Sequence, residues 1–120
     1  AISPKTEHVS PRDNFVATLK YTDGSVCTLI YTALGASEVA KEYIEIYCDG
    51  KTLIIDNFKE LKIYGAKQKG WKGSQDKGHL RELEEFGKHL RESGPWPITL
   101  DELARATKIS FRVDEGVQAQ

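Results

Sequence analysis

The 120-residue sequence has no methionine and no apolar run close to the roughly 20 residues that a membrane-spanning helix needs. Residues 1–5 have neither the basic start nor the apolar core of a signal peptide. We therefore expect a cytoplasmic protein. Because methionine is missing even at position 1, we also expect these residues to be a piece of a longer protein.

The sequence has no excess of charge of either sign. Seventeen basic and eighteen acidic residues give a net charge of −1, and the two signs are interspersed along the chain. Proteins that bind nucleic acid or anionic membranes usually carry a basic patch or stripe. The charge pattern therefore predicts no nucleic-acid partner and no membrane partner.

Cysteine and histidine are scarce. The two cysteines, Cys27 and Cys48, lie inside apolar, strand-like runs, and a domain of this size folds without a disulfide. We expect both to be reduced and buried, because a free cysteine packs like a small hydrophobic residue. The three histidines show none of the close Cys/His spacing of a zinc site. The sequence therefore predicts no metal site.

Alternating apolar and polar residues at 14–22 and 42–48, and β-branched and aromatic residues at 26–34, indicate β-strands. The apolar residues of 51–56 are consecutive instead of alternating, which is typical of a central strand covered on both faces. The runs predict strands over residues 14–22, 26–34, 42–48, 51–56 and 61–64. Asp23-Gly24 and Asp49-Gly50 separate two pairs of these runs and are typical of tight hairpin turns. If Asp23 and Gly24 form the whole first loop, Leu19 lies opposite Thr28 and Ala17 opposite Ile30.

Helix signals come only after residue 78. Leu80, Leu83, Phe86 and Leu90 recur at helical spacing and predict an amphipathic helix over residues 79–92, which ends at Ser93-Gly94-Pro95. Thr99 with Glu102 has the form of a capping box and predicts a second helix from there to about Val113. On this second helix we expect one face made by Leu103, Ala106, Thr107, Ser110 and Phe111, with Ile109 and Val113 beside it.

These elements predict an α+β fold in two layers: a mostly antiparallel open sheet of four to six strands, with both C-terminal helices packed on one face. Residues 1–13 are expected to form an irregular or edge-strand entry segment, and residues 14–120 a single domain. The sheet face that carries Val16, Thr18, Leu29 and Tyr31, if the helices leave it uncovered, is a candidate interface with a second copy of the chain. The alternative is that Lys20 and Thr22 make this face polar enough to stay in contact with solvent.

Four residues are candidates for positions close to a substrate. Trp71 and Lys77 lie in a glycine- and lysine-rich loop, residues 65–78, which is typical either of a solvated crossover or of a contact with phosphates or bases. His79, near Lys77 at a helix start, is either an acid/base group or an exposed first-turn residue. Glu45 lies on a strand face between Tyr43 and Tyr47 and points either to solvent or to a ligand cavity.

Neither a phosphate-binding loop of the form Gly-x-x-x-x-Gly-Lys-Ser/Thr nor a Gly-x-Gly-x-x-Gly fingerprint occurs in the sequence. No serine or cysteine stands in a motif that supplies a base to activate it. The residues alone therefore predict no catalytic and no cofactor-binding group.

Four segments, taken in order, resemble the C-terminal domain of the glucose-fructose oxidoreductase / inositol dehydrogenase (Gfo/Idh/MocA) family. They are residues 13–26 (DNFVATLKYTDGSV), 42–50 (EYIEIYCDG), 76–86 (DKGHLRELEEF) and 97–102 (PITLDE) followed by Ala106-Thr107. The resemblance implies a sheet domain that forms the floor of an active site and a subunit interface. In such enzymes it lies beneath an N-terminal Rossmann domain that holds NAD or NADP.

The departures from the family pattern limit what the resemblance implies. The dinucleotide fingerprint, the Glu-Lys-Pro motif with its catalytic lysine and the Asp/His pair of such enzymes are all absent from these residues. We therefore expect the chain alone to be inactive and to bind no cofactor. The parent enzyme would be a dehydrogenase acting on a hydroxyl of a sugar, a nucleotide sugar or a cyclitol, and would form a homo-oligomer through the sheet face. The alternative is a free-standing binding module with the same layout.

Overall fold

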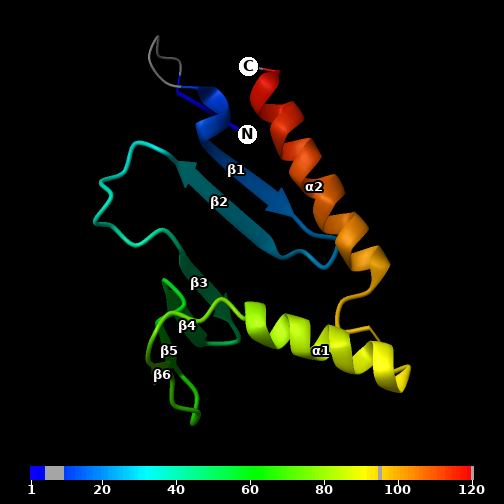
Figure 1. The fold of residues 1–120 in the computed structure, drawn as a ribbon. Coiled ribbons are helices and arrows are strands. Elements are labelled where there is room, and N and C mark those ends of the chain that lie inside the picture. Colours follow the sequence, from blue (N-terminus) through cyan, green and yellow to red (C-terminus); the bar gives the residue numbers. More distant parts are fainter. Residues whose placement is uncertain (5–9, 95, 120) are drawn as a thin grey trace. The chain divides into compact units, whose positions relative to one another are not determined.

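The computed structural model describes residues 1–4, 10–94 and 96–119. It has the α+β class that the sequence predicts: antiparallel strands come first, and two helices follow at the C-terminal end (Figure 1). The elements, in chain order, are the 3-10 helix η1 (Pro11–Asp13), β1 (Asn14–Lys20), β2 (Val26–Thr32), β3 (Tyr43–Cys48), β4 (Lys51–Asp56), β5 (Glu60–Tyr64), β6 (Trp71–Lys72), α1 (His79–Glu92) and α2 (Leu100–Gln118).

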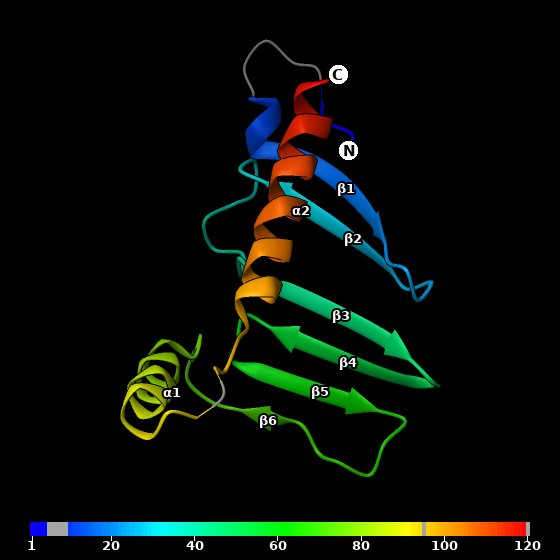
Figure 2. The same cartoon turned by 90° about the vertical axis from the view of Figure 1, so that its right-hand side faces the viewer.

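The chain divides into two compact units. Unit 1 consists of Ala1–Gly35 with Ile98–Gln120, and unit 2 of Ala36–Pro97. Unit 1 therefore holds the β1–β2 hairpin and α2, whereas unit 2 holds a four-stranded sheet in the order β3-β4-β5-β6 and α1 (Figure 2). The strands of the expected open sheet are divided between two sheets, because in the described part of the chain β2 pairs only with β1 and β3 only with β4. The single domain over residues 14–120 stays a prediction.

The register of the β1–β2 hairpin differs by one residue from the prediction. Ala17 lies opposite Leu29 and Leu19 opposite Cys27. The loop contains three residues instead of two, since the Tyr21 N–H donates to the Ser25 carbonyl at 2.9 Å. Gly24 takes the left-handed φ of +90° that ends such a loop. A slip of one residue moves every side chain of a strand to the opposite face of its partner.

Unit 1 has a small core at one end of its hairpin. Ala17 and Asn14 on β1 and Val117 near the end of α2 are buried. Arg12 in η1 and Asp114 in α2 form an ion pair of 3.4 Å, which holds the C-terminal part of α2 beside the start of β1 (Figure 1). The covered stripe of α2 is Ile109, Val113 and Val117, not the predicted face with Leu103 and Phe111, which is exposed.

The four-stranded sheet of unit 2 has two faces of different character. The Asp49-Gly50 turn is the predicted two-residue loop, with Cys48 opposite Lys51 and φ positive at both turn residues. The register puts a first set of residues, named here the apolar face, on one side: Ile44, Ile46, Leu53, Ile55, Leu61, Ile63 and Trp71. The opposite side, named the tyrosine face, carries Tyr43, Glu45, Tyr47, Thr52, Ile54, Asp56, Glu60, Lys62, Tyr64 and Lys72.

Helix α1 has the predicted bounds, but its apolar stripe is not covered as expected. Leu83 and the other stripe residues are exposed, and Trp96 packs instead against Phe86 and His89, with ring centroids 5.4 and 3.5 Å apart. Helix α1 belongs to unit 2 and α2 to unit 1. Ser93, not Gly94, takes the left-handed conformation that ends α1, and Pro95 lies outside the described residues.

Helix α2 begins with the predicted capping box and continues past the predicted end. The Glu102 N–H donates to the Thr99 hydroxyl oxygen, and the Thr99 N–H donates to the Glu102 carboxylate at 2.8 Å. The helix then runs to Gln118 because residues 114–118 contain no helix-breaking proline.

Two further expectations concern single features. Cys27 and Cys48 are free thiols, as predicted, but both are exposed, because the strand faces that carry them are uncovered. Among the described ranges, no helix is long and apolar enough to cross a membrane.

Candidate functional site

Glu45 is the centre of a row of three side chains on the tyrosine face. One carboxylate oxygen accepts a hydrogen bond from the Tyr43 hydroxyl at 3.0 Å, and the other accepts one from the Tyr47 hydroxyl at 3.1 Å. Residues two apart on a strand point to the same side, which is why the three side chains meet. Of the two sequence interpretations of Glu45, the structure supports the exposed position.

This arrangement changes the acidity of both phenols. The hydrogen bond to Glu45 raises the pKa of Tyr43 and of Tyr47 above 10.0, because ionising a phenol would remove its donor and place two negative charges together. Both phenols therefore act as neutral hydroxyl groups, and their exposed rings lie on either side of a carboxylate. Such a row can contact a ligand through ring faces and hydroxyl groups.

Lys77 lies in the loop that precedes α1. Its ammonium group donates to the Glu42 carboxylate and lies 6.0 Å from the centre of the Phe58 ring. Phe58 has a positive φ of 52° in the β4–β5 turn, which turns it toward this loop. Neither Glu42 nor Phe58 was predicted from the sequence, since the three residues are distant along the chain and no local pattern relates them.

The four candidate residues do not come together. Glu45 is on the tyrosine face, whereas Trp71 is on the apolar face opposite Leu61. His79 is the exposed first residue of α1, and Lys77 already has a carboxylate partner. An acid/base pair of Lys77 with His79 has no hydrogen bond to support it in the described structure.

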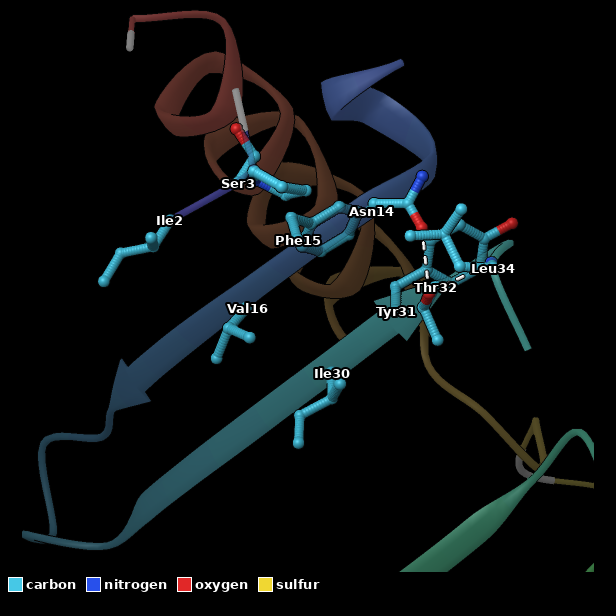
Figure 3. Close-up of a pocket in the computed structure, with 10 residues that line it drawn as sticks. Ile2, Ser3, Asn14, Phe15, Val16, Ile30, Tyr31, Thr32 and Leu34 are labelled. Carbon is cyan, nitrogen blue, oxygen red and sulfur yellow. Dashed lines mark hydrogen bonds between the residues drawn. The ribbon is translucent and has the colours of Figure 1, made fainter. Parts of the chain in front are cut away.

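A separate pocket of about 320 Å³ lies on the β1–β2 hairpin (Figure 3). Its walls are apolar apart from Ser3, Asn14 and Thr32. The Asn14 side chain accepts from the Thr32 hydroxyl at 2.8 Å and from the Ala33 N–H at 3.0 Å, and it donates to the Ser10 carbonyl. Since these bonds already satisfy Asn14, its amide joins the two strand ends and is not available to orient a ligand.

The four candidate interface residues divide between the two faces of this hairpin. Val16 and Thr18 lie on one face, together with Ile30 and Thr28 across the pair. Leu29 and Tyr31 lie on the other, where the Tyr31 and Phe15 rings stack with centroids 5.5 Å apart. The predicted single interface face is therefore corrected to two half-sets, as a consequence of the one-residue change in register.

The described residues do not fit a nicotinamide cofactor of the Rossmann kind or a metal ion. Every strand pair in this part of the chain is antiparallel, so the strand–loop–helix–strand unit that binds a dinucleotide is not formed. Within the same residues, no group of three or more His, Cys, Asp or Glu side chains is placed to hold a metal ion.

Comparison with known proteins gives no match to a family model, to a curated protein or to a solved structure.

Proposed function

We propose that this chain is a non-catalytic portion of an NAD(P)-dependent dehydrogenase, with roles in shaping the substrate site and in oligomerisation. The substrate class is a hydroxyl of a sugar, a nucleotide sugar or a cyclitol. The proposal starts from the four resembling segments described above. Its partner is a nucleotide-binding domain, which supplies NAD or NADP and the catalytic groups that these residues lack.

The observation that carries the proposal is the small amount of buried structure. Among the residues that the structure describes, only Asn14, Ala17 and Val117 are buried, and none of them belongs to unit 2. A free-standing domain of this length normally buries about two-thirds of the surface that its unfolded chain exposes. Large apolar surfaces that stay uncovered are typical of contacts with another protein or domain.

Two surfaces match the two proposed roles. The tyrosine face, with Glu45 held between two phenols, has the ring faces and hydroxyl groups that a site for polyhydroxylated substrates uses. The hairpin face with Val16 and Ile30 has exposed apolar side chains, with Lys20 at its far end, and suits a contact with a second copy.

The test is an activity comparison. The coding sequence that contains this chain should also encode a Gly-x-Gly-x-x-Gly unit upstream. The polypeptide it encodes should reduce NAD or NADP in the presence of one member of a sugar, nucleotide-sugar and cyclitol panel, whereas the 120 residues alone should not. A coding sequence without the Rossmann unit, or no activity across the panel, would favour the free-standing binding module instead.

A further inference from the structure

The β5–β6 hairpin at the outer edge of the four-stranded sheet concentrates positive charge (Figure 2). Residues 59–72 contain five lysines and one glutamate, a local net charge of +4 in a chain whose net charge is −1. The even distribution of charge along the sequence as a whole hides this feature.

The only carboxylate of this stretch neutralises one face of the hairpin. Glu60 lies 3.4 Å from Lys62 and 3.8 Å from Lys72, and the register puts all three on the tyrosine face. Lys59, Lys67 and Lys69 are exposed, and within the described ranges none of them has an ion pair. Uncompensated charge is therefore confined to the loop and to the other face.

Trp71 lies on that other face, and the backbones of two uncompensated lysines are close to it. Lys69 is two residues before it along the chain. The Gly73 N–H donates to the Lys59 carbonyl at 2.8 Å, which extends the strand pairing by one residue and puts Lys59 on the Trp71 side, next to Leu61. Trp71 is 46 % exposed, so its indole ring is accessible to a ligand.

Two glycines fix the loop that carries Lys67 and Lys69. Gly65 has a φ of +73°, and a side chain there would meet the backbone of Gly50. A side chain at Gly70 would overlap the Leu61 carbonyl. Both ends of the loop are thus held against neighbouring backbone. The loop backbone therefore loses less conformational entropy when the lysines bind a ligand.

We propose that this hairpin binds a nucleoside diphosphate group, with the base stacked on Trp71 and the phosphates bound by Lys59 and Lys69. Ammonium groups bind phosphate oxygens through charge-assisted hydrogen bonds, and an exposed indole stacks on any base. The inference does not depend on the proposed dehydrogenase function. The diphosphate belongs to a free nucleotide, to a nucleotide-linked sugar or to a dinucleotide.

The test uses Trp71 fluorescence in a Trp96→Phe background, because the chain has two tryptophans. UDP should quench the signal in a saturable manner, whereas uridine and inorganic pyrophosphate should each bind at least about tenfold more weakly. UDP-glucose and NAD⁺ are titrated in the same way. The ligand that binds most tightly among UDP, UDP-glucose and NAD⁺ identifies the source of the diphosphate group.

The matched control compares two double variants, each of which removes two lysines from one side of the hairpin. Lys59→Gln with Lys69→Gln should weaken UDP binding about tenfold, whereas Lys62→Gln with Lys72→Gln removes the same charge from the opposite face and should change it less than twofold. Trp71→Leu, followed by calorimetry, should also weaken binding about tenfold. Equal effects of the two lysine pairs, pyrophosphate binding as tight as UDP, or no saturable binding would overturn the proposal. Because these assays need no hydride transfer, their failure is separate from failure of the dehydrogenase assay.

Discussion

At the scale of single residues, short hydrogen bonds between near neighbours account for the groups with altered acidity. The Ser25 N–H donates to the Asp23 carboxylate at 2.9 Å and lowers the pKa of Asp23 below 3.8. Glu45 raises the pKa of Tyr43 and Tyr47 because its carboxylate accepts hydrogen bonds from their hydroxyl groups. In each case the bond favours the protonation state that can make it.

Replacing Glu45 with Gln should lower the pKa of Tyr43 and Tyr47 toward 10.0, because the negative charge that opposes phenol ionisation is removed. Their raised pKa means that the bonds stabilise the fold below pH 10.0 and that this contribution is lost as pH rises through the folded-state pKa. Phenolate absorbance against pH measures the change. Glu38→Gln, at an exposed carboxylate that accepts a hydrogen bond from the Ser37 hydroxyl, is the control and should leave the titration curve of the two tyrosines unchanged.

At the scale of elements, local signals determine where helices and turns begin, and close backbone contacts determine which glycines are required. Gly70 has a neighbouring carbonyl where its side chain would be, whereas Gly73 has open space. The two glycines flank the same short strand, β6, and make a controlled pair.

Gly70→Ala should destabilise the β5–β6 hairpin by about 2 kcal/mol, because the added methyl group forces the strands apart. Gly73→Ala should change the free energy of unfolding by less than about 0.5 kcal/mol. Hydrogen exchange of the Gly73 N–H reports the pairing directly, since this group donates to Lys59. If the two variants behave alike, the close approach at Leu61 is not as described.

The capping box of α2 gives a second prediction at this scale. Thr99→Ala should cost about 1 kcal/mol of stability, because the helix start loses an N-cap. The Thr99 N–H lowers the pKa of Glu102 below 4.5, so the Glu102 contribution is present above pH 4.5 and is lost as pH falls through the folded-state pKa. Urea unfolding at a series of pH values should show this loss in the wild type, and a smaller acid dependence in Glu102→Gln. An unchanged acid dependence in that variant would contradict the capping role.

At the scale of the whole molecule, the lack of buried apolar residues is the main feature. Unit 2 has a folded sheet and a helix, yet none of its described residues is buried. The proposed explanation is that these surfaces are covered by another domain and by a second copy of the chain.

If the proposed self-association uses the hairpin face with Val16 and Thr18, Val16→Glu should shift the chain toward monomer, and Leu29→Glu, on the opposite face, should not. A buried, unpaired carboxylate at an interface is strongly unfavourable. Sedimentation velocity at several concentrations measures the shift, with circular dichroism to check that both variants fold. The reverse result would assign the interface to the face with Tyr31, and no shift in either variant would exclude the hairpin.

The sequence by itself determined the elements, because their signals are local. The period of two along β1 and β3, the consecutive apolar residues of β4, the Asp49-Gly50 turn, the bounds of α1 and the Thr99/Glu102 cap all depend on residues a few positions apart. The alternation also placed Glu45 between Tyr43 and Tyr47, although it did not indicate that both phenols bond to the carboxylate.

Only the tertiary structure decided how the elements combine, because that depends on contacts between distant residues. The Ser25 N–H donates to the Asp23 carboxylate in a loop of three residues, one more than predicted. This change in register puts Val16 and Leu29 on opposite faces of the hairpin. The Glu42–Lys77 pair and the separation of Glu45 from Trp71 follow from strand register and loop packing, which no local pattern encodes. The lysines of the β5–β6 hairpin are visible in the sequence, but only the register shows that Glu60 neutralises one face and leaves the Trp71 face charged.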